Sequence, residues 1–388
     1  MPGSVIYSNQ ARTTILVDIP ASIESGQRIP YRLKSAAALD DPYPSTEPRG
    51  SKRETALGAI PLHDRTYHES VQKDISSALT EIQDHLRGQG SPSYWCHGRH
   101  ALLPNSERVL QAMPLAPFRS SPGSTGDLSL LAPVILSTTE TQTRFSSIDC
   151  LRGVAVCNPS RDRTAVVETG DAGEFLIPAH ALFVLASLEG GMAGFHSARQ
   201  MLLPPPQQFH LIVMDPPWSN RSARRSGVYR TSEHQETDPF PEAMRIVKEC
   251  LASRGWLAVW ITNKVSVRKD VIDAVGLLNL HLHEEWVWIK TTARGVPVTV
   301  LDGVWRRPYE ILLLFQEDRV CKVPRRRVIA AVPDVHSRKP SLKALLDELL
   351  PGEYHALELF ARSLTAGWWS WGDEVLKFQH ESQWSREV

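Results

Sequence analysis

Short apolar runs that alternate with helix-like segments set the strongest limit on how this chain can fold. From about residue 175 onward they occupy residues 182–188, 209–214, 256–261, 286–289 and 311–315. The run at 209–214 (FHLIVM) is almost continuously apolar, which is typical of a parallel strand that helices bury on both faces. The rhythm therefore predicts an α/β fold with a mostly parallel sheet.

Helices are indicated by apolar residues at intervals of three and four. The clearest stripe precedes a stop signal at Gly88 and consists of Val71, Ile75, Leu79, Ile82 and Leu86. Shorter stripes follow within residues 241–251 and 342–349. We expect helices at all three places, each packed against a partner element.

The length of the chain predicts two parts, because a single hydrophobic core rarely grows beyond 250 to 300 residues and this chain has 388. Pro, Ser and Gly cluster at 41–52 and 117–126, as they do in loops. We therefore expect a mixed, partly irregular and partly disordered accessory region over residues 1–170, with a role in substrate recognition. The main α/β domain is expected over residues 171–388.

Charge and cysteine usage narrow the classes of partner. The 43 basic and 43 acidic residues cancel, so any nucleic acid must be held by local patches. Five scattered cysteines without a C-x-x-C pair argue against a disulfide framework and a zinc site, and no metal is expected. No apolar run is long enough for a membrane span and no signal peptide is visible, which predicts an intracellular protein without a membrane partner.

The run at 209–214 leads directly into Asp215, Pro216, Pro217 and Trp218. Ligands in open α/β sheets bind outside the carboxyl ends of strands, so a site is expected here. Two prolines give a stiff turn that presents carbonyl oxygens without competing N–H groups. An exocyclic amine would complement this loop, with its hydrogens on the Asp215 carboxylate and the Pro216 carbonyl and its base stacked on Trp218. The alternative is an ordinary strand-to-loop turn.

Basic residues after this loop suggest a nucleic-acid surface. The predicted contacts are Asn220, Arg221, Arg224, Arg225 and Arg230, together with Lys290 at the end of a later strand. Guanidinium groups beside the loop would contact phosphates around a base turned out of its stack. A solvated surface loop is the alternative. A second group, within residues 319–327, is equally compatible with plain surface and with nucleic acid. Most of the eleven tryptophans are expected in the core.

The loop and several later blocks resemble the family that contains the catalytic subunit of the mRNA adenosine-N6 methyltransferase, and are most similar to its methyltransferase-like-four branch. The resemblance covers residues 203–384, about half of the chain. Its blocks, in the family's order, are residues 260–264 (WITNK), 285–290 (EWVWIK), 307–310 (RPYE), 336–340 (HSRKP) and 357–374 (LELFARSLTAGWWSWGDE).

The resemblance implies a Rossmann-like fold that methylates the N6 amine of adenine in nucleic acid, with S-adenosylmethionine as cofactor. It also implies RNA, of the small nuclear RNA type, ahead of DNA, and a nuclear location. Lys339 would meet the methionine carboxylate of the cofactor. The cofactor-binding residues implied as a set are Ser187, Leu188, Asp215, Lys339, Phe360, Arg362, Thr365, Asp373 and Glu374.

Two departures from the family pattern leave other functions open. Asp373 stands where the family usually has Asn, and Ser187-Leu188 stands where relatives have Asp followed by an apolar residue. The glycines at 190, 191 and 194 are interpreted as a plain turn. One alternative is a catalytically silent scaffold that binds nucleic acid or a protein. Another is an enzyme that methylates cytosine N4 or a protein glutamine.

Overall fold

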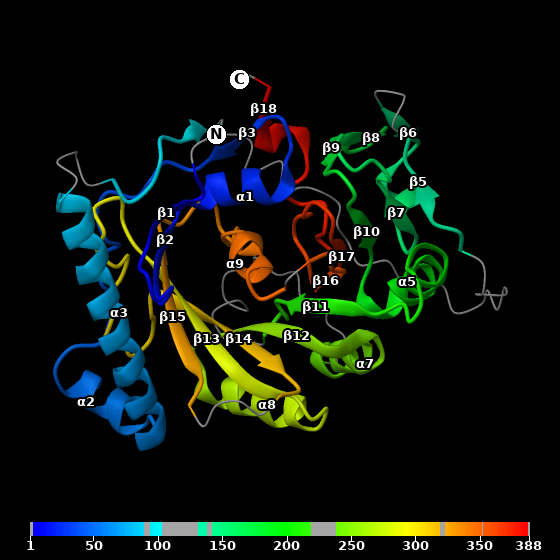
Figure 1. Cartoon of the computed structure of the whole chain (residues 1–388). Helices are drawn as coiled ribbons and strands as arrows, with labels where there is room; N and C mark the ends of the chain where they lie inside the picture. Colours follow the sequence, from blue (N-terminus) through cyan, green and yellow to red (C-terminus); the bar gives the residue numbers. More distant parts are fainter. Residues whose placement is uncertain are drawn as a thin grey trace.

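The computed structural model describes residues 3–88, 94–102, 131–137, 142–218, 238–318, 323–350 and 352–386. A twelve-stranded sheet runs through the molecule with helices on both sides (Figure 1). In spatial order its strands are β1 (Val5–Ser8), β2 (Thr14–Val17), β15 (Arg325–Ala331), β13 (His281–Lys290), β14 (Tyr309–Gln316), β12 (Leu251–Ile261), β11 (Phe209–Met214), β16 (Ala356–Leu359), β17 (Trp369–Gly372), β10 (Leu182–Leu185), β7 (Ala155–Cys157) and β5 (Val134–Ile135).

Most neighbouring strands of this sheet run parallel, as the sequence predicted. The exceptions are the pairs β1–β2, β10–β7, β12–β14 and β13–β14. Two small sheets flank it, namely β18 (Trp384–Ser385), β3 (Arg32–Ser35) and β4 (His100–Ala101), and β6 (Thr143–Phe145), β8 (Ala165–Thr169) and β9 (Gly173–Ile177). The α/β class and the Rossmann-like arrangement are confirmed.

The helices of the described residues lie between these strands in sequence. They are α1 (Ile19–Gln27), α2 (Ser51–Gly58), α3 (Leu62–Gly88), α5 (Leu188–Leu202), α7 (Phe240–Cys250), α8 (Val265–Gly276) and α9 (Lys343–Asp347). The three predicted helices correspond to α3, α7 and α9. In α3 the predicted stripe faces inward, with Val71, Ile75 and Ile82 fully buried. No helix in the described ranges is long and apolar enough to cross a membrane.

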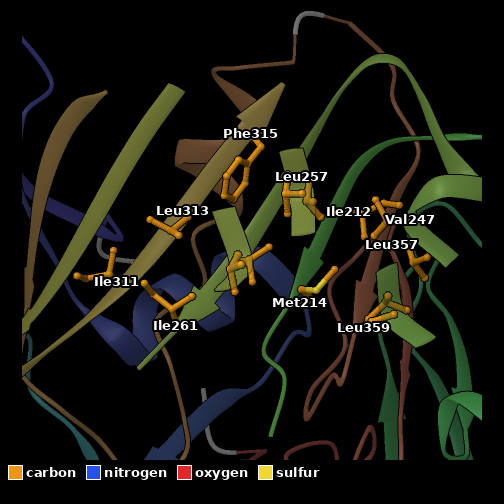
Figure 2. Close-up of a cluster of buried hydrophobic side chains, with 14 of the residues drawn as sticks. Ile212, Met214, Val247, Leu257, Ile261, Ile311, Leu313, Phe315, Leu357 and Leu359 are labelled. Atoms are coloured by element: carbon orange, nitrogen blue, oxygen red, sulfur yellow. The ribbon is translucent and has the colours of Figure 1, made fainter. Parts of the chain in front are cut away.

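The central strands are buried on both faces, which explains why their sequences are apolar without alternation. Ile212 and Met214 of β11 point into one cluster with Leu257, Leu313 and Leu359, and Figure 2 shows how closely these side chains gather. The intervening Leu211 and Val213 belong to the cluster on the opposite face. Each fully buried aliphatic side chain contributes about 1.5–3 kcal/mol, so the strand before the candidate loop is held firmly. The tryptophans at 286, 288, 368, 369 and 371 are buried, as predicted.

The start of α5 corrects two local predictions. The apolar run at 182–188 is strand only to Leu185, because Ser187 caps the helix and its Oγ accepts a hydrogen bond from the Gly190 backbone N–H at 3.1 Å. The interpretation of the following glycines as a turn was wrong, since they lie in α5. A Cβ on Gly191 would lie 2.6 Å from Nε1 of Trp371, so this glycine lets the helix approach the sheet.

The N-terminal part supplies both edges of the large sheet. β2 pairs in parallel with β15 at one side, and β7 pairs antiparallel with β10 at the other. α3 packs against β2, β13 and β15, and it lies along that edge in Figure 1. The sheet therefore includes strands from both sides of the boundary at residue 170. A role of residues 1–170 in substrate recognition stays a prediction.

Candidate active site

The Asp215 loop lies where the sheet offers three parallel carboxyl ends side by side. β11 pairs in parallel with β12 and with β16, so the loop after Met214 starts between the ends of these strands. The Asp215 backbone N–H donates to the carbonyl of Leu359 at 3.4 Å, which fixes the loop to the end of β16. The Asp215 side chain is half-buried. The predicted position of the loop, at the edge of the sheet where ligands bind, matches the structure.

Two cations hold the Asp215 carboxylate. Nζ of Lys339 and Nη1 of Arg362 each lie 3.5 Å from Oδ2 of Asp215. Lys339 also pairs with Glu310, and Nζ of Lys290 lies 2.5 Å from Oε1 of Glu310. The charges thus alternate along a chain of side chains that come from β11, β13, β14 and the loop before α9.

The alternating charges keep these side chains ionised although they are largely shielded from water. Burial alone would raise the pKa of the Glu310 carboxyl, but Lys339 and Lys290 hold that pKa well below its usual range. Burial alone would lower the pKa of Lys339, but Asp215 and Glu310 raise it above its ordinary value. Lys339 therefore remains a cation at neutral pH and can bind an anionic group.

Trp218 is fixed by contacts on two sides. Its Nε1 donates to the carbonyl of Trp260 at 2.8 Å, and its ring centre lies 5.2 Å from that of Phe240. Its backbone N–H donates to the carbonyl of Pro216 at 2.8 Å. A carbonyl oxygen has two lone pairs, so the Pro216 carbonyl retains one for a further donor. The loop is therefore a rigid turn with a half-buried aromatic ring beside two oxygen acceptors.

A cavity of about 100 Å³ opens next to Asp215. Five residues predicted to bind the cofactor line it: Asp215, Lys339, Phe360, Arg362 and Thr365. The cavity is also lined by Gln27 of α1, so the N-terminal part contributes directly to this site. The sequence carried no signal for Gln27, because its approach depends on the long-range packing of α1.

Glu358 in β16 also lines the cavity, and the sequence analysis missed it. Burial, and then the negative charge of Asp215, raise the pKa of this carboxyl to about 8, while Arg362 opposes them. Glu358 is therefore mostly neutral at pH 7. A signal for it existed, since one glutamate interrupts the apolar run at 356–360 (ALELF), where a buried charge is rarely placed without a reason.

The other residues predicted to bind the cofactor lie outside the lining of this cavity. Ser187 caps α5 and Leu188 is buried in the core. Glu374 connects to the cavity through Arg362, whose Nε lies 3.0 Å from its Oε2. Asp373 has a buried Oδ1 that meets no hydrogen-bond donor in the described parts of the chain. Burial raises the pKa of Asp373 against the attraction of Arg152, and its Oδ1 is open to a donor such as a ligand hydroxyl.

Of the predicted nucleic-acid contacts, the structure describes Lys290. This side chain is half-buried, pairs with Glu310 and lies 4.7 Å from the ring centre of Trp288. The remaining predicted contacts lie outside the described residues: Asn220, Arg221, Arg224, Arg225 and Arg230.

The second basic group is partly internal. Arg319 and Lys322 lie outside the described residues. Nη1 of Arg326 lies 2.5 Å from Oδ2 of Asp74, and Nε of Arg327 lies 2.6 Å from Oε2 of Glu284. These two arginines therefore tie α3 and β13 to β15.

Comparison with known proteins identifies the family. The family model described as MT-A70 matches residues 209–374, from the first residue of β11 to Glu374. N6-methyladenosine RNA methyltransferase MTA1 of Cryphonectria parasitica is 31% identical over 387 residues, which cover 98% of this chain and 94% of that protein. The chain belongs to the MT-A70 family.

Other MT-A70 relatives match a shorter part. N(6)-adenine-specific methyltransferase METTL4 of Mus musculus is 33% identical over 53% of this chain and 44% of its own length. A protein named DNA N6-methyl methyltransferase, from Caenorhabditis elegans, is 29% identical over 59% of this chain and 60% of its own length. The expected family and its methyltransferase-like-four branch are confirmed. The Cryphonectria protein is named for N6-methyladenosine in RNA, the Caenorhabditis protein for N6 methylation of DNA, and METTL4 for adenine alone.

Proposed function

We propose that this MT-A70 protein transfers a methyl group from S-adenosylmethionine to the N6 amine of adenine in nucleic acid, with RNA of the small nuclear RNA type as the favoured substrate. The observation that carries the proposal is the carboxylate of Asp215 at the ends of three parallel strands, beside the Pro216 carbonyl and the ring of Trp218. One relative is named as an RNA methyltransferase and another as a DNA methyltransferase, and both names support the reaction class.

The residues around the cavity fit this cofactor. Lys339 and Arg362 are cations that can pair with a methionine carboxylate. The buried Oδ1 of Asp373, which meets no described donor, suits a ribose hydroxyl. The cavity of about 100 Å³ is smaller than the roughly 300–1,000 Å³ of typical ligand sites, so side chains must move apart on binding. A carboxylate that binds Lys339 and Arg362 would compete with Asp215 for them.

The chemistry of the amine follows from the oxygen acceptors. Both cations contact Oδ2 of Asp215, which leaves Oδ1 for one amine hydrogen, while the Pro216 carbonyl takes the other. Bound S-adenosylmethionine supplies an electrophilic methyl group on a sulfonium. The loop orients the lone pair of a weakly nucleophilic amine toward that methyl, and such positioning is expected to supply much of the rate. After methylation, the Asp215 carboxylate or water would accept the proton that the amine releases.

The preference for RNA over DNA is supported by the extent of similarity. The relative that matches nearly the full chain is named as an RNA methyltransferase, whereas the one named for DNA matches 59% of this chain. Because residues 1–170 contribute to the sheet and the cavity, similarity over the whole length is the better guide. A nuclear location is proposed on the family resemblance.

The test is transfer of a labelled methyl group from S-adenosylmethionine to single-stranded RNA and DNA oligonucleotides. Nucleoside analysis by mass spectrometry would identify N6-methyladenine and distinguish it from N4-methylcytosine. Asp215→Asn should abolish transfer, because the neutral amide loses the attraction to Lys339 and Arg362 and presents an NH2 group where a carboxylate oxygen stood. Asp270→Asn, which changes an exposed carboxylate on α8, should leave it intact. Absence of methyl transfer from the native chain to every oligonucleotide would refute the proposal.

A catalytically silent scaffold is the second candidate, and the cofactor-site departures favour it. Ser187 serves as a helix cap and Oδ1 of Asp373 meets no donor in the described residues, at two positions where the chain departs from the family pattern. Calorimetry with S-adenosylmethionine separates the two candidates. A scaffold with a decayed pocket gives no heat of binding, whereas the enzyme gives a saturable one.

A further inference from the structure

A loop beside the candidate site is built in a way that the proposed chemistry does not require. It spans residues 291–308, leaves the end of β13 after Lys290 and returns to β14 at Tyr309. Its base is closed by two backbone hydrogen bonds, from Lys290 N–H to the Pro308 carbonyl at 2.7 Å and from Val298 N–H to the Lys290 carbonyl at 3.0 Å. Lys290 and Glu310 belong to the charged chain around Asp215, so the loop stands at the rim of that site.

The N-terminal part holds this loop through a single carboxylate. Glu47 accepts hydrogen bonds from three consecutive backbone N–H groups, those of Val304 at 2.6 Å, Trp305 at 3.1 Å and Arg306 at 2.9 Å. Successive N–H groups that converge in this way form an anion-binding concavity. Nη2 of Arg53 adds an ion pair to Asp302 at 2.6 Å. The tip of the loop is therefore fixed from a segment about 250 residues away in sequence.

These contacts of Glu47 and Arg53 hold an exposed aromatic ring in place. Trp305 is 64% exposed, although the other tryptophans of the described core are buried. Single exposed apolar residues are common on protein surfaces, but a ring fixed on a braced turn at the rim of a candidate site is well placed to contact a substrate. Every nucleic-acid base offers a flat π surface, and an aromatic side chain held in a groove or at a rim is the usual platform for it.

Positive charge accompanies the ring. Arg306 is exposed and Arg307 is partly buried, and neither has a carboxylate within salt-bridge distance in the described ranges. By contrast, the neighbouring Arg294 and Arg53 pair with Asp41 and Asp302. Glu47 and Asp302 lie at the same turn and partly balance these charges, but the exposed guanidinium of Arg306 forms no salt bridge within the described ranges and can meet a phosphate.

The sequence separation between Trp305 and Glu310 limits how far the ring can lie from the site, and so which base it can reach. Trp305 precedes Glu310 by five residues, so their Cα atoms are separated by at most roughly 18 Å. Within this limit, a few nucleotides of an extended strand can reach from the site to Trp305. Trp218 is the aromatic residue of the catalytic loop itself. Trp305 is therefore placed for a neighbour of the target adenine rather than for the target.

We propose that Trp305 stacks on a nucleotide that flanks the target adenine, with Arg306 on an adjacent phosphate and Glu47 as the positioning residue for both. The proposal rests on the proposed function, since it assigns a second contact to the same substrate. It also gives the N-terminal part a defined task in substrate recognition.

The test measures binding of a fluorescent single-stranded RNA of roughly 15 nucleotides, with one adenine in a uridine background. Abasic sites are placed in turn at each position beside the adenine. In the native chain one flanking position should weaken binding when its base is removed, by about 5-fold to 150-fold. Trp305→Ala should show that loss with the intact RNA and no further loss at that position. Trp305→Phe should restore most of the binding.

Glu47→Ala should reproduce the position-specific loss, because the ring is no longer held. A purely structural role of Glu47 would instead weaken binding equally at all positions. Leu277→Ala is the matched control, since Leu277 is 88% exposed and lies just before β13 begins, at the far end of that strand from the loop. It should leave the abasic profile unchanged.

The outcomes separate this proposal from the proposed function, because binding is measured without S-adenosylmethionine. Methyl transfer together with an abasic profile that Trp305→Ala does not alter would overturn the flanking-base contact and leave the reaction standing. A position-specific effect of Trp305→Ala without methyl transfer would support the flanking-base contact and overturn the proposed reaction. Unchanged RNA binding with altered self-association of Trp305→Ala would assign the surface to a protein and overturn the proposal.

Discussion

Glu358 gives the sharpest prediction, because its environment makes stability depend on pH in a known direction. Burial and the charge of Asp215 raise the pKa of this carboxyl from 4.5 to about 8 in the folded chain. The folded state therefore favours the protonated form. Stability from this group is fully present below pH 4.5, declines as the pH rises toward 8, and is constant above that. Glu358→Gln removes the titration.

The size of the effect follows from the two pKa values. Between pH 4.5 and pH 7, a span of about 2.5 pH units, Glu358 ionises in the unfolded chain but stays mostly protonated in the folded chain. This difference lowers the free energy of unfolding by at most about 3.4 kcal/mol. Solvent reaches part of the side chain, and this screening reduces the expected value to about 2 kcal/mol. Glu358→Gln should thus be more stable than the native chain by about 2 kcal/mol at pH 7 and by well under 1 kcal/mol at about pH 5.

The assay is urea unfolding of both proteins across that pH range, with the free energy of unfolding extrapolated to water. The same comparison in an Asp215→Asn background provides the control. Without the charge of Asp215 the pKa of Glu358 is expected to fall, and the difference between Glu and Gln should shrink. A difference that is the same at every pH would show that Glu358 is ionised throughout and would refute the reasoning.

Three further changes test other parts of the site and the packing behind it. Lys339→Met should weaken S-adenosylmethionine binding roughly 10-fold to 100-fold in calorimetry, because a charge-assisted contact to its carboxylate is lost; unchanged affinity would remove Lys339 from the cofactor site. Asp373→Asn should tighten the same binding by roughly 5-fold at pH 7, since an amide needs no proton and can donate; weaker binding would indicate that the carboxylate is needed as an acceptor. Gly191→Ala should lower the free energy of unfolding by about 1–3 kcal/mol, because a Cβ would lie 2.6 Å from Nε1 of Trp371; a neutral result in thermal unfolding would show that α5 shifts freely.

The elements that local sequence could predict are those whose neighbours along the chain decide their structure. The stripe from Val71 to Leu86 repeats at helical spacing, and α3 buries that face. The run from Phe209 to Met214 is apolar because both faces of β11 are covered, and the chain turns at Asp215 where two prolines follow. These signals are contained within a few residues, so the position of the catalytic loop could be predicted.

The rest of the site depends on pairings that no local pattern records. Glu310 belongs to the recognisable block at residues 307–310, yet its role appears only when Lys290 and Lys339 are placed on either side of it. Glu47 stands in the Pro-, Ser- and Gly-rich stretch at 41–52 and Gln27 stands at the end of α1, and the residues that they contact lie more than 250 positions away in sequence. The family resemblance implied a cofactor contact for Ser187, and the structure shows this residue as the cap of α5.

The balanced charge of the chain does not argue against a nucleic-acid substrate, because many of its cations are already used internally. Arg326 and Arg327 are tied to Asp74 and Glu284, and Lys290 is tied to Glu310. The opposite charges of each such pair largely cancel in the electrostatic field that acts on a distant phosphate. The field at the rim of the site is set by arginines without a described acidic partner, such as Arg306. Net charge therefore averages over pairs that hold the fold, and the charges at the rim of the site are the quantity relevant to substrate binding.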